Sequence, residues 1–207
     1  MKLFDRFDKV YCINLEHRED RKNHILSQCV KYDLGDLSFF KAINGNNIMN
    51  PYRIPNGCVG LILSNIEIIK QAKNNNYKSI LILEDDCYFT NEVLNIDSYF
   101  DALPDDWDMM YIGGNHNTHM GDLPPKKINE KIVKLHNTFT THFIAINHNM
   151  YDVILERLSK FNSPIDVIYA GIQKTYNVYS TSKAIAKQLN GYSDIENKVI
   201  NYDWLIK

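Results

Sequence analysis

Three adjacent carboxylates, Glu84, Asp85 and Asp86, follow directly after the aliphatic run at residues 79–83. Like charges at the end of a buried strand repel each other unless a positive species lies close to them. In an extended chain Glu84 and Asp86 should point to one side and Asp85 to the other. Two carboxylates on one side suit a hard divalent cation such as Mg²⁺ or Mn²⁺, whereas a solvated loop would need no partner.

Several chemistries place acids at the end of a strand. A haloacid-dehalogenase-type phosphatase needs a nucleophilic Asp where this chain has Glu84. A response-regulator receiver needs a phosphoacceptor Asp after a later strand, and the next strand-like segment ends in Ile112-Gly113-Gly114 instead. Nucleotidyl or phosphoryl transfer and glycosyl transfer from a nucleotide sugar remain, because an acidic metal site stabilises a phosphate leaving group in each.

Alternating strand-like and helical segments predict an α/β domain with a mostly parallel central sheet flanked by helices. The expected strands are residues 10–14, 39–43, 79–83, 108–112, 142–147 and 175–180, and the expected helices are residues 16–32, 58–74, 91–103, 150–161 and 164–173. The polar segment 114–137 is expected to be a mobile excursion, and residues 188–207 carry few regular signals. Ligands bind beyond the carboxyl ends of such strands, where the three carboxylates, Asn14 and the Asn44-Gly45 turn are expected.

Composition narrows the class of protein. The chain has 207 residues, of which 44% are hydrophobic and 23% charged, as in ordinary globular proteins. A net charge of −2 argues against a nucleic-acid partner bound through bulk electrostatics. No apolar run predicts a signal peptide or a transmembrane segment, and the four widely spaced cysteines favour a reducing compartment. These features predict a cytoplasmic protein, and they leave an oligomer possible.

Seven segments, in order along the chain, resemble glycosyltransferase family 25, which includes lipooligosaccharide and collagen galactosyltransferases. The segments are VYCINLEHREDRKNHI, FFKAINGNNI, GCVGLILSNIEIIKQA, ILILEDDCYF, WDMMYIGG, PIDVIYA and QLNGYSDIE. The resemblance covers about residues 10–196. Two positions depart from the family's pattern: Asn44 stands where Asp is common, and Asn65 stands where a Ser-His pair is usual.

The resemblance implies a single GT-A-type (Rossmann-like) domain over residues 1–207, with a nucleotide-binding half at about 1–115 and an acceptor-binding half at about 116–207. It implies a UDP-sugar donor, Mn²⁺ or Mg²⁺, and inversion at the anomeric carbon. The sugar would be galactose or glucose, and the acceptor a hydroxyl group of a glycan or protein. The departures favour one rival, a catalytically silent sugar-nucleotide-binding protein. The other rival is a metal-dependent nucleotidyl or phosphoryl transferase.

Asp86 is the principal candidate for a metal ligand, with Glu84 beside it. Histidines without diagnostic spacing are further candidates: His116, His119, His136, His142 and His148. Single-displacement inversion also needs a carboxylate that takes the proton of the acceptor hydroxyl. Asp194 and Asp166 are the two candidates for that base, although Asp166 could instead be a first-turn acid that favours its helix dipole.

Polar residues spread along the resemblance are candidates for donor contacts. They are Asn14, Arg18, Asn44, Ser64, Asp85 and Gln188. Asn14 could instead cap the following helix, and Arg18 is a better candidate than Arg21. Ser64 and Glu67 match a Ser-x-x-Glu capping box, so Ser64 either begins a helix or lies inside a helix that faces the donor. Gln188 could contact either the donor or the acceptor.

Overall fold

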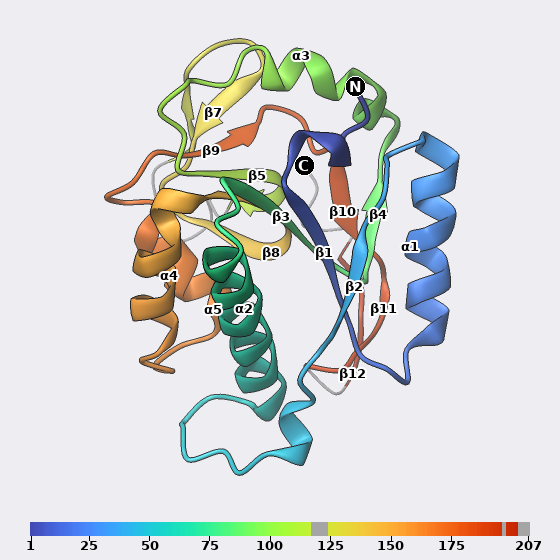
Figure 1. Cartoon of the computed structure of the whole chain (residues 1–207), viewed down its shortest axis with the longest axis vertical. Helices are drawn as coiled ribbons and strands as arrows, with labels where there is room; N and C mark the ends of the chain where they lie inside the picture. Colours follow the sequence, from blue (N-terminus) through green and yellow to red (C-terminus); the bar gives the residue numbers. More distant parts are fainter. Residues whose placement is uncertain (117–123, 196–197, 203–207) are drawn as a thin grey trace.

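Figure 1 shows the computed structural model of the chain, which describes residues 1–116, 124–195 and 198–202. One mixed sheet forms its centre. Its strands are β1 (Lys9–Asn14), β2 (Ser38–Lys41), β3 (Ser79–Glu84), β5 (Met109–His116), β6 (Lys126–Lys127), β7 (Ile132–Lys134), β8 (Thr138–Asn147) and β9 (Val178–Thr181). Their order across the sheet is β2-β1-β3-β8-β5-β9-β7-β6.

Parallel pairing dominates the part of the sheet that carries the acidic residues. β1 pairs in parallel with both β2 and β3, and β5 pairs in parallel with β9. Between these groups β8 runs antiparallel to β3 and β5. The predicted fold class is therefore confirmed as an α/β domain with a large central sheet flanked by helices, and this sheet is mixed, with three parallel and four antiparallel pairings.

Helices and short strands surround this sheet. The helices are α1 (Glu19–Tyr32), α2 (Asn56–Asn74), α3 (Ile96–Phe100), α4 (Tyr151–Leu158), α5 (Ile165–Ile172) and the 3-10 turns η1 (Phe4–Arg6), η2 (Gly45–Asn47), η3 (Asn91–Asn95) and η4 (His148–Met150). Two small antiparallel ladders join β4 (Cys87–Phe89) to β10 (Ala186–Gln188) and β11 (Gly191–Ser193) to β12 (Lys198–Ile200). Within the described ranges, no helix has both the length and the apolar character that a membrane span requires.

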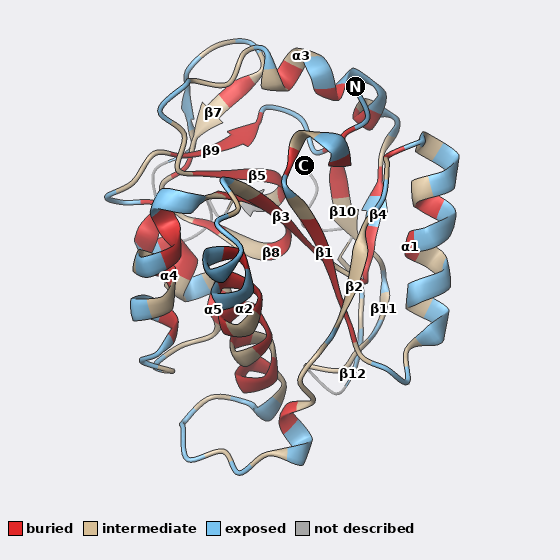
Figure 2. Cartoon of the chain, viewed as in Figure 1, coloured by how far each residue is buried: buried red, intermediate tan, exposed pale blue. Residues whose placement is uncertain are grey.

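Strands β1 and β3 are apolar between their end residues because both faces of the sheet are covered. In β1, Val10 and Cys12 pack in one core with α1, α3, β4 and β10, whereas Tyr11 and Ile13 pack in a second core with α2, α4 and α5. The buried strands lie between helices whose outer faces are exposed (Figure 2). The helices on the two faces leave the carboxyl ends of β1, β2 and β3 uncovered, and a pocket opens there.

Several local predictions were wrong because tertiary pairing overrides local pattern. The predicted helix at 91–103 is divided into η3 and α3 at Asn95, which has ψ near 9°. The predicted excursion at 114–137 begins inside β5 and contributes β6 and β7 to the sheet, while residues 117–123 of it lie outside the described residues. The segment after residue 187 forms β11 and β12, although its sequence predicted little regular structure.

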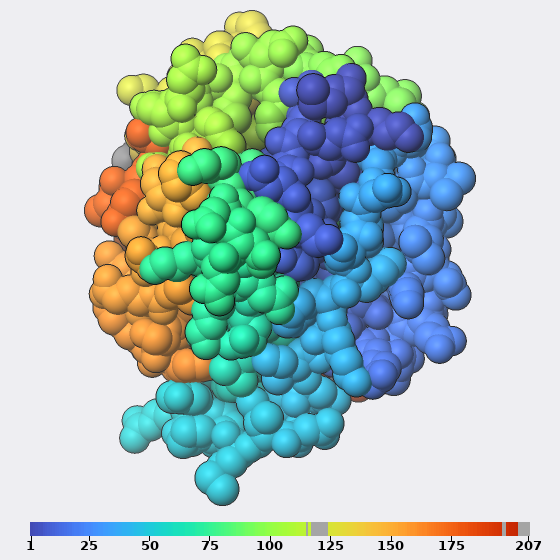
Figure 3. Space-filling model, in the orientation of Figure 1, coloured from blue at the N-terminus to red at the C-terminus, as the bar shows by residue number. Residues whose placement is uncertain are grey.

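The end of β2 is packed tightly against the first turns of α2. This helix begins at Asn56, eight residues before Ser64, so of the two alternatives for Ser64 the structure excludes the capping box and places Ser64 inside the helix. A Cβ on Gly45 would lie 1.7 Å from the carbonyl oxygen of Asn56, and a Cβ on Gly60 would lie 2.4 Å from that of Ile43. Glycine at 45 and 60 therefore allows the two backbones to meet. The loop that joins them, residues 48–55, projects from one end of the molecule (Figure 3).

Replacing Gly60 by Ala should lower the free energy of unfolding by about 1–3 kcal/mol, because the new methyl group meets backbone that cannot move aside. Gly171→Ala is the matched control, since Gly171 also lies in a helix but nothing stands within 4 Å of its added Cβ. That control should gain about 0.5–1 kcal/mol from helix preference. Urea unfolding measures both, and equal effects would contradict the close approach.

Candidate active site

The three carboxylates lie where β3 leaves the sheet. β3 ends at Glu84, and Asp85 and Asp86 form the turn into β4. Both aspartates are buried, while Glu84 is half-buried. The guanidinium of Arg21 lies 2.8 Å from Asp85 Oδ1 and 4.0 Å from Asp86 Oδ2. The predicted strand-like alternation past Glu84 was therefore wrong, because the turn brings both aspartates to the same arginine.

Burial makes ionisation of these carboxylates costly. The pKa of Asp85 is raised mainly by burial, which outweighs the opposing effects of Arg21 and Asn14. Burial also raises the pKa of Asp86. Glu84 has a raised pKa because it is withdrawn from water and lies near Asp86, and a hydrogen bond from Thr141 opposes this rise. A further cation at this turn would therefore be bound favourably.

Asn14 fixes the acidic turn against the beginning of α1. Its Nδ2 donates to Asp85 Oδ2 at 2.8 Å and to the carbonyl oxygen of Arg18 at 3.1 Å. The residue at the N-cap of α1 is Arg18, and no side chain caps the helix. One alternative from the sequence was that Asn14 caps α1, and the structure excludes it. Asn14 orients Asp85 instead.

Asp86 has one oxygen that is not used by the protein. Its Oδ2 accepts from Gln188 Nε2 at 3.4 Å, and its backbone oxygen accepts from Leu189 N at 2.8 Å, because the β4–β10 ladder brings residue 188 beside it. Its Oδ1 is buried and finds no hydrogen-bond partner in the described part of the chain. A buried carboxylate oxygen without a partner is the donor that a hard divalent cation takes.

The residues at this turn fit a metal ion whose remaining ligands come from elsewhere. Across residues 1–116, 124–195 and 198–202, no three His, Cys, Asp or Glu side chains form a group that could hold a metal ion. His142 is buried with Nε2 3.4 Å from the carbonyl oxygen of Ala186, and His116 bonds Thr138. His119 lies outside the described residues. Glu84 and Asp86, the two predicted metal ligands, are close enough for the charge of Asp86 to raise the pKa of Glu84.

A pocket of about 280 Å³ opens beyond the ends of β1, β2 and β3. Its polar lining includes His17, Arg21, Asn44, Asn46, Ser64, Glu84, Asp85, Ser193 and Asp194. Among the predicted donor contacts, Asn44, Ser64 and Asp85 line it. Ser64 is also tied to the backbone, since its Oγ donates to Gly60 O at 2.8 Å and accepts from Ile43 N at 2.9 Å.

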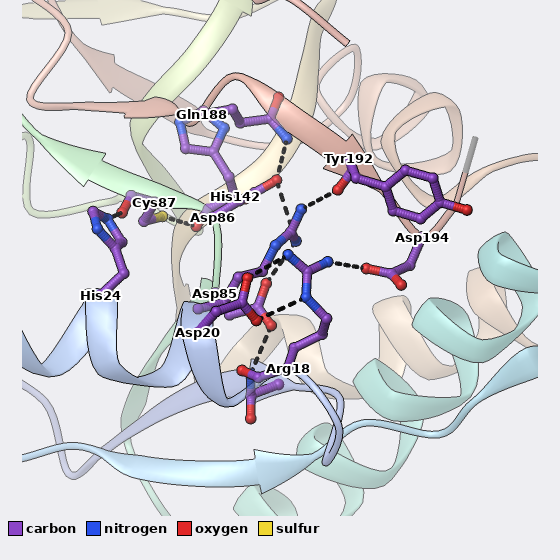
Figure 4. A network of polar contacts seen from close by, with 12 residues as sticks. Arg18, Asp20, His24, Asp85, Asp86, Cys87, His142, Gln188, Tyr192 and Asp194 are labelled. Atoms are coloured by element: carbon purple, nitrogen blue, oxygen red, sulfur yellow. Dashed lines mark hydrogen bonds and ion pairs between the residues drawn. The ribbon is translucent and has the colours of Figure 1, made fainter. Parts of the chain in front are cut away.

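Arg18 and Arg21, at the start of α1, hold the segment 191–195, and residues 193–195 of it line this pocket. Figure 4 shows Arg18 pointing toward Asp194. Arg18 Nη1 lies 2.5 Å from Asp194 Oδ2, and the same guanidinium pairs with Asp20. Arg21 Nη2 donates to the carbonyl oxygen of Tyr192 at 2.7 Å. Arg21 was ranked below Arg18 from sequence, yet it is the one that contacts the acidic turn. Only the long-range packing of α1 against this turn reveals that contact.

Asp166, the other predicted base, lies in the first turn of α5, as its position after Pro164 indicated. Its Oδ1 accepts from Val167 N at 2.9 Å. Burial raises its pKa, and its charge contributes to the raised pKa of Glu84. Asp194 lines the pocket together with Glu84, whereas Asp166 lies in α5 and is not among the residues that line it.

A family model described as glycosyltransferase family 25 (LPS biosynthesis protein) matches residues 7–204. The chain belongs to glycosyltransferase family 25. The resemblance inferred from sequence is confirmed by this match.

Relatives within family 25 are distant and much longer. The chain is 27% identical over 129 residues to procollagen galactosyltransferase 1-B of Xenopus laevis, a match that covers 52% of this chain and 21% of the relative. It is 23% identical over 130 residues to procollagen galactosyltransferase 2 of Homo sapiens, with the same coverage. The chain thus spans about one fifth of the length of these curated relatives.

Solved structures give weaker likenesses. One is a glycosyltransferase involved in glycosylation of the major capsid of PBCV-1, with a TM-score of 0.44, 13% identity, and coverage of 75% of this chain and 67% of that one. Another is a putative glucose-1-phosphate thymidylyltransferase from Bacillus anthracis, with a TM-score of 0.47, 9% identity, and coverage of 84% and 87%.

The raised pKa of Glu84 predicts a pH dependence of stability. A carboxyl whose pKa is higher in the folded state stabilises the fold fully below its unfolded pKa, and that contribution is lost as pH rises through the folded pKa. The free energy of unfolding of Glu84→Gln should therefore increase relative to that of the wild type as pH rises from about 4. The gain should be at most on the order of 1 kcal/mol per pH unit within that window.

Urea unfolding at pH 5 and pH 8 measures this difference. Glu67→Gln is the control, because Glu67 lies on α2 in an exposed pair with Lys70. A constant difference between Glu84→Gln and the wild type across this range would show that Glu84 ionises as freely in the folded chain as in the unfolded one.

Proposed function

We propose that this chain is a metal-dependent, inverting glycosyltransferase that moves a hexose, galactose or glucose, from a UDP-sugar to a hydroxyl of a glycan or protein acceptor. The unpartnered Oδ1 of Asp86 carries this proposal, because it lies in an acidic turn next to a pocket in a family 25 chain. The names of the galactosyltransferase relatives support galactose as the sugar.

Glu84 and Asp86 would hold Mn²⁺ or Mg²⁺, Asp86 through its free Oδ1. When bound, such an ion neutralises the charge that develops on a leaving diphosphate. Arg21 adds a permanent positive charge at the pocket wall and keeps Asp85 in place. Asn44 can accept a hydrogen bond as an Asp would at this position, since its Oδ1 accepts from Asn46 N at 3.0 Å.

In a single displacement the acceptor oxygen forms a bond to the anomeric carbon as the bond from that carbon to the diphosphate oxygen breaks. UDP leaves with the electron pair, and a carboxylate takes the proton of the acceptor hydroxyl. We assign this proton to Asp166. Its raised pKa makes it a stronger base than an ordinary Asp, whereas Arg18 binds Asp194 Oδ2 at 2.5 Å and thereby competes for that oxygen.

A panel of UDP-sugars incubated with Mn²⁺ tests the proposal through the release of UDP and free or transferred sugar. Release should disappear with EDTA. It should fall by about 100-fold or more in Asp86→Asn, because this variant loses a ligand of the metal that stabilises the charge developing on the diphosphate. Asp105→Asn, which changes an exposed acid in the turn before β5, should leave the rate unchanged. Asp166→Asn should reduce the rate more than Asp194→Asn.

Other products would identify the rivals. Donor binding without turnover across the panel would favour a silent sugar-nucleotide-binding protein. Release of UMP or inorganic phosphate would favour nucleotidyl or phosphoryl transfer. UDP release that survives both EDTA and Asp86→Asn would contradict the dependence of the reaction on a metal at this turn.

A further inference from the structure

β8 is irregular where it passes Glu84. In the β5–β8 ladder Asn115 is paired with Phe139 and Gly113 with Phe143, so residues 140–142 oppose Gly114 alone. Such a bulge interrupts pairing and redirects side chains, and bulges are frequent beside active sites. Here it turns Thr141 toward β3, and Thr141 Oγ1 donates to Glu84 Oε1 at 2.6 Å.

Thr140 adopts a conformation that its side chain disfavours. Its φ is +66°, and it is the single β-branched residue with positive φ among the described non-glycine residues. A β-branched residue at such a φ is strained, and strain of this kind persists where the surroundings enforce it, commonly at functional sites.

Gln173 supplies much of that enforcement. This fully buried side chain donates from Nε2 to Thr138 O at 2.7 Å and accepts at Oε1 from Thr138 N at 2.8 Å. The beginning of β8 is thus fastened to the end of α5, the helix that carries Asp166. This double contact fixes the backbone two residues before Thr140.

The hydroxyl of Thr140 is buried and has no hydrogen-bond partner within the part of the chain that the structure describes. The backbone N–H of Thr140 lies close enough to Asp166 to oppose the rise in its pKa. On the other side, Asp166 is near Glu84, which Thr141 holds. The strained residue Thr140 therefore carries an unused hydroxyl, its backbone N–H reaches Asp166, and its neighbour Thr141 holds Glu84. A buried hydroxyl without a partner is costly unless a ligand uses it.

We propose that Thr140 contacts the acceptor: its Oγ1 binds the attacking hydroxyl group of an alcohol or sugar beside Asp166, on the β8–α5 side of Glu84. This inference rests on the proposed transfer reaction and adds the place of the acceptor. Thr140 Oγ1 and Asp166 then both form hydrogen bonds with the attacking hydroxyl. The proton of that hydroxyl passes to Asp166 as the hydroxyl oxygen forms a bond to the anomeric carbon and UDP departs. Thr141 positions Glu84 and does not touch the acceptor.

The test uses Thr140→Gly, Thr140→Ser and the full chain. Glycine adopts positive φ without strain, so Thr140→Gly should melt at the same temperature as the wild type or higher. Its UDP release with water as the acceptor should fall about tenfold, the worth of one hydrogen bond at the transition state. The KM for the UDP-sugar should stay the same, and Thr140→Ser, which keeps the hydroxyl, should recover most of the rate.

Asn76→Gly is the control, since Asn76 also has positive φ and lies after α2, away from the acidic turn. It should be as stable as the wild type or more so, with an unchanged rate. Equal rates for Thr140→Gly and the wild type, a Ser variant as slow as the Gly variant, or a Gly variant that melts lower would each overturn the assignment. A wild type that releases no UDP from any donor would instead refute the transfer reaction itself.

Discussion

The structure depends on three carboxylates packed together at the end of one strand, two of them buried and one half-buried. Burial raises the pKa of Glu84, Asp85 and Asp86, and Arg21 is the cation that approaches two of them. A single guanidinium leaves this turn with more negative than positive charge. The proposed metal ion would supply the further positive charge. The neighbours of the turn either supply charge, as Arg21 does, or hold an acid in place, as Asn14, Thr141 and Gln188 do.

Elements far apart in sequence converge on that turn, and each has a separate task. β1 and α1 supply Asn14 and the two arginines, and the glycine contacts between η2 and α2 shape the pocket wall. On the opposite side β8 and α5 bring Thr141 and Asp166 to Glu84. Glu84 lies between the two regions. This arrangement suits a reaction in which a donor and an acceptor meet across one carboxylate.

Much of the fold and part of the site were readable from sequence. The apolar run before Glu84, the helical spacing of α2 and the acidic triplet gave the central sheet and the site's place at its edge. Arg21 was undervalued because its contact with Asp85 joins residues 64 positions apart. The bulge at Thr140 was missed because Gly113-Gly114 indicated the end of a strand, whereas β5 continues to His116. Capping at Ser64 failed because α2 begins eight residues earlier.

Mn²⁺ binding, followed by electron paramagnetic resonance with and without UDP, tests the central claim most directly. The protein offers two carboxylate ligands, so Mn²⁺ should bind weakly alone and much more tightly once UDP supplies phosphate oxygens. Asp86→Asn should abolish the UDP-dependent binding while the chain remains folded. Equal Mn²⁺ binding by Asp86→Asn and the wild type in the presence of UDP would contradict the assignment of this turn as the metal site.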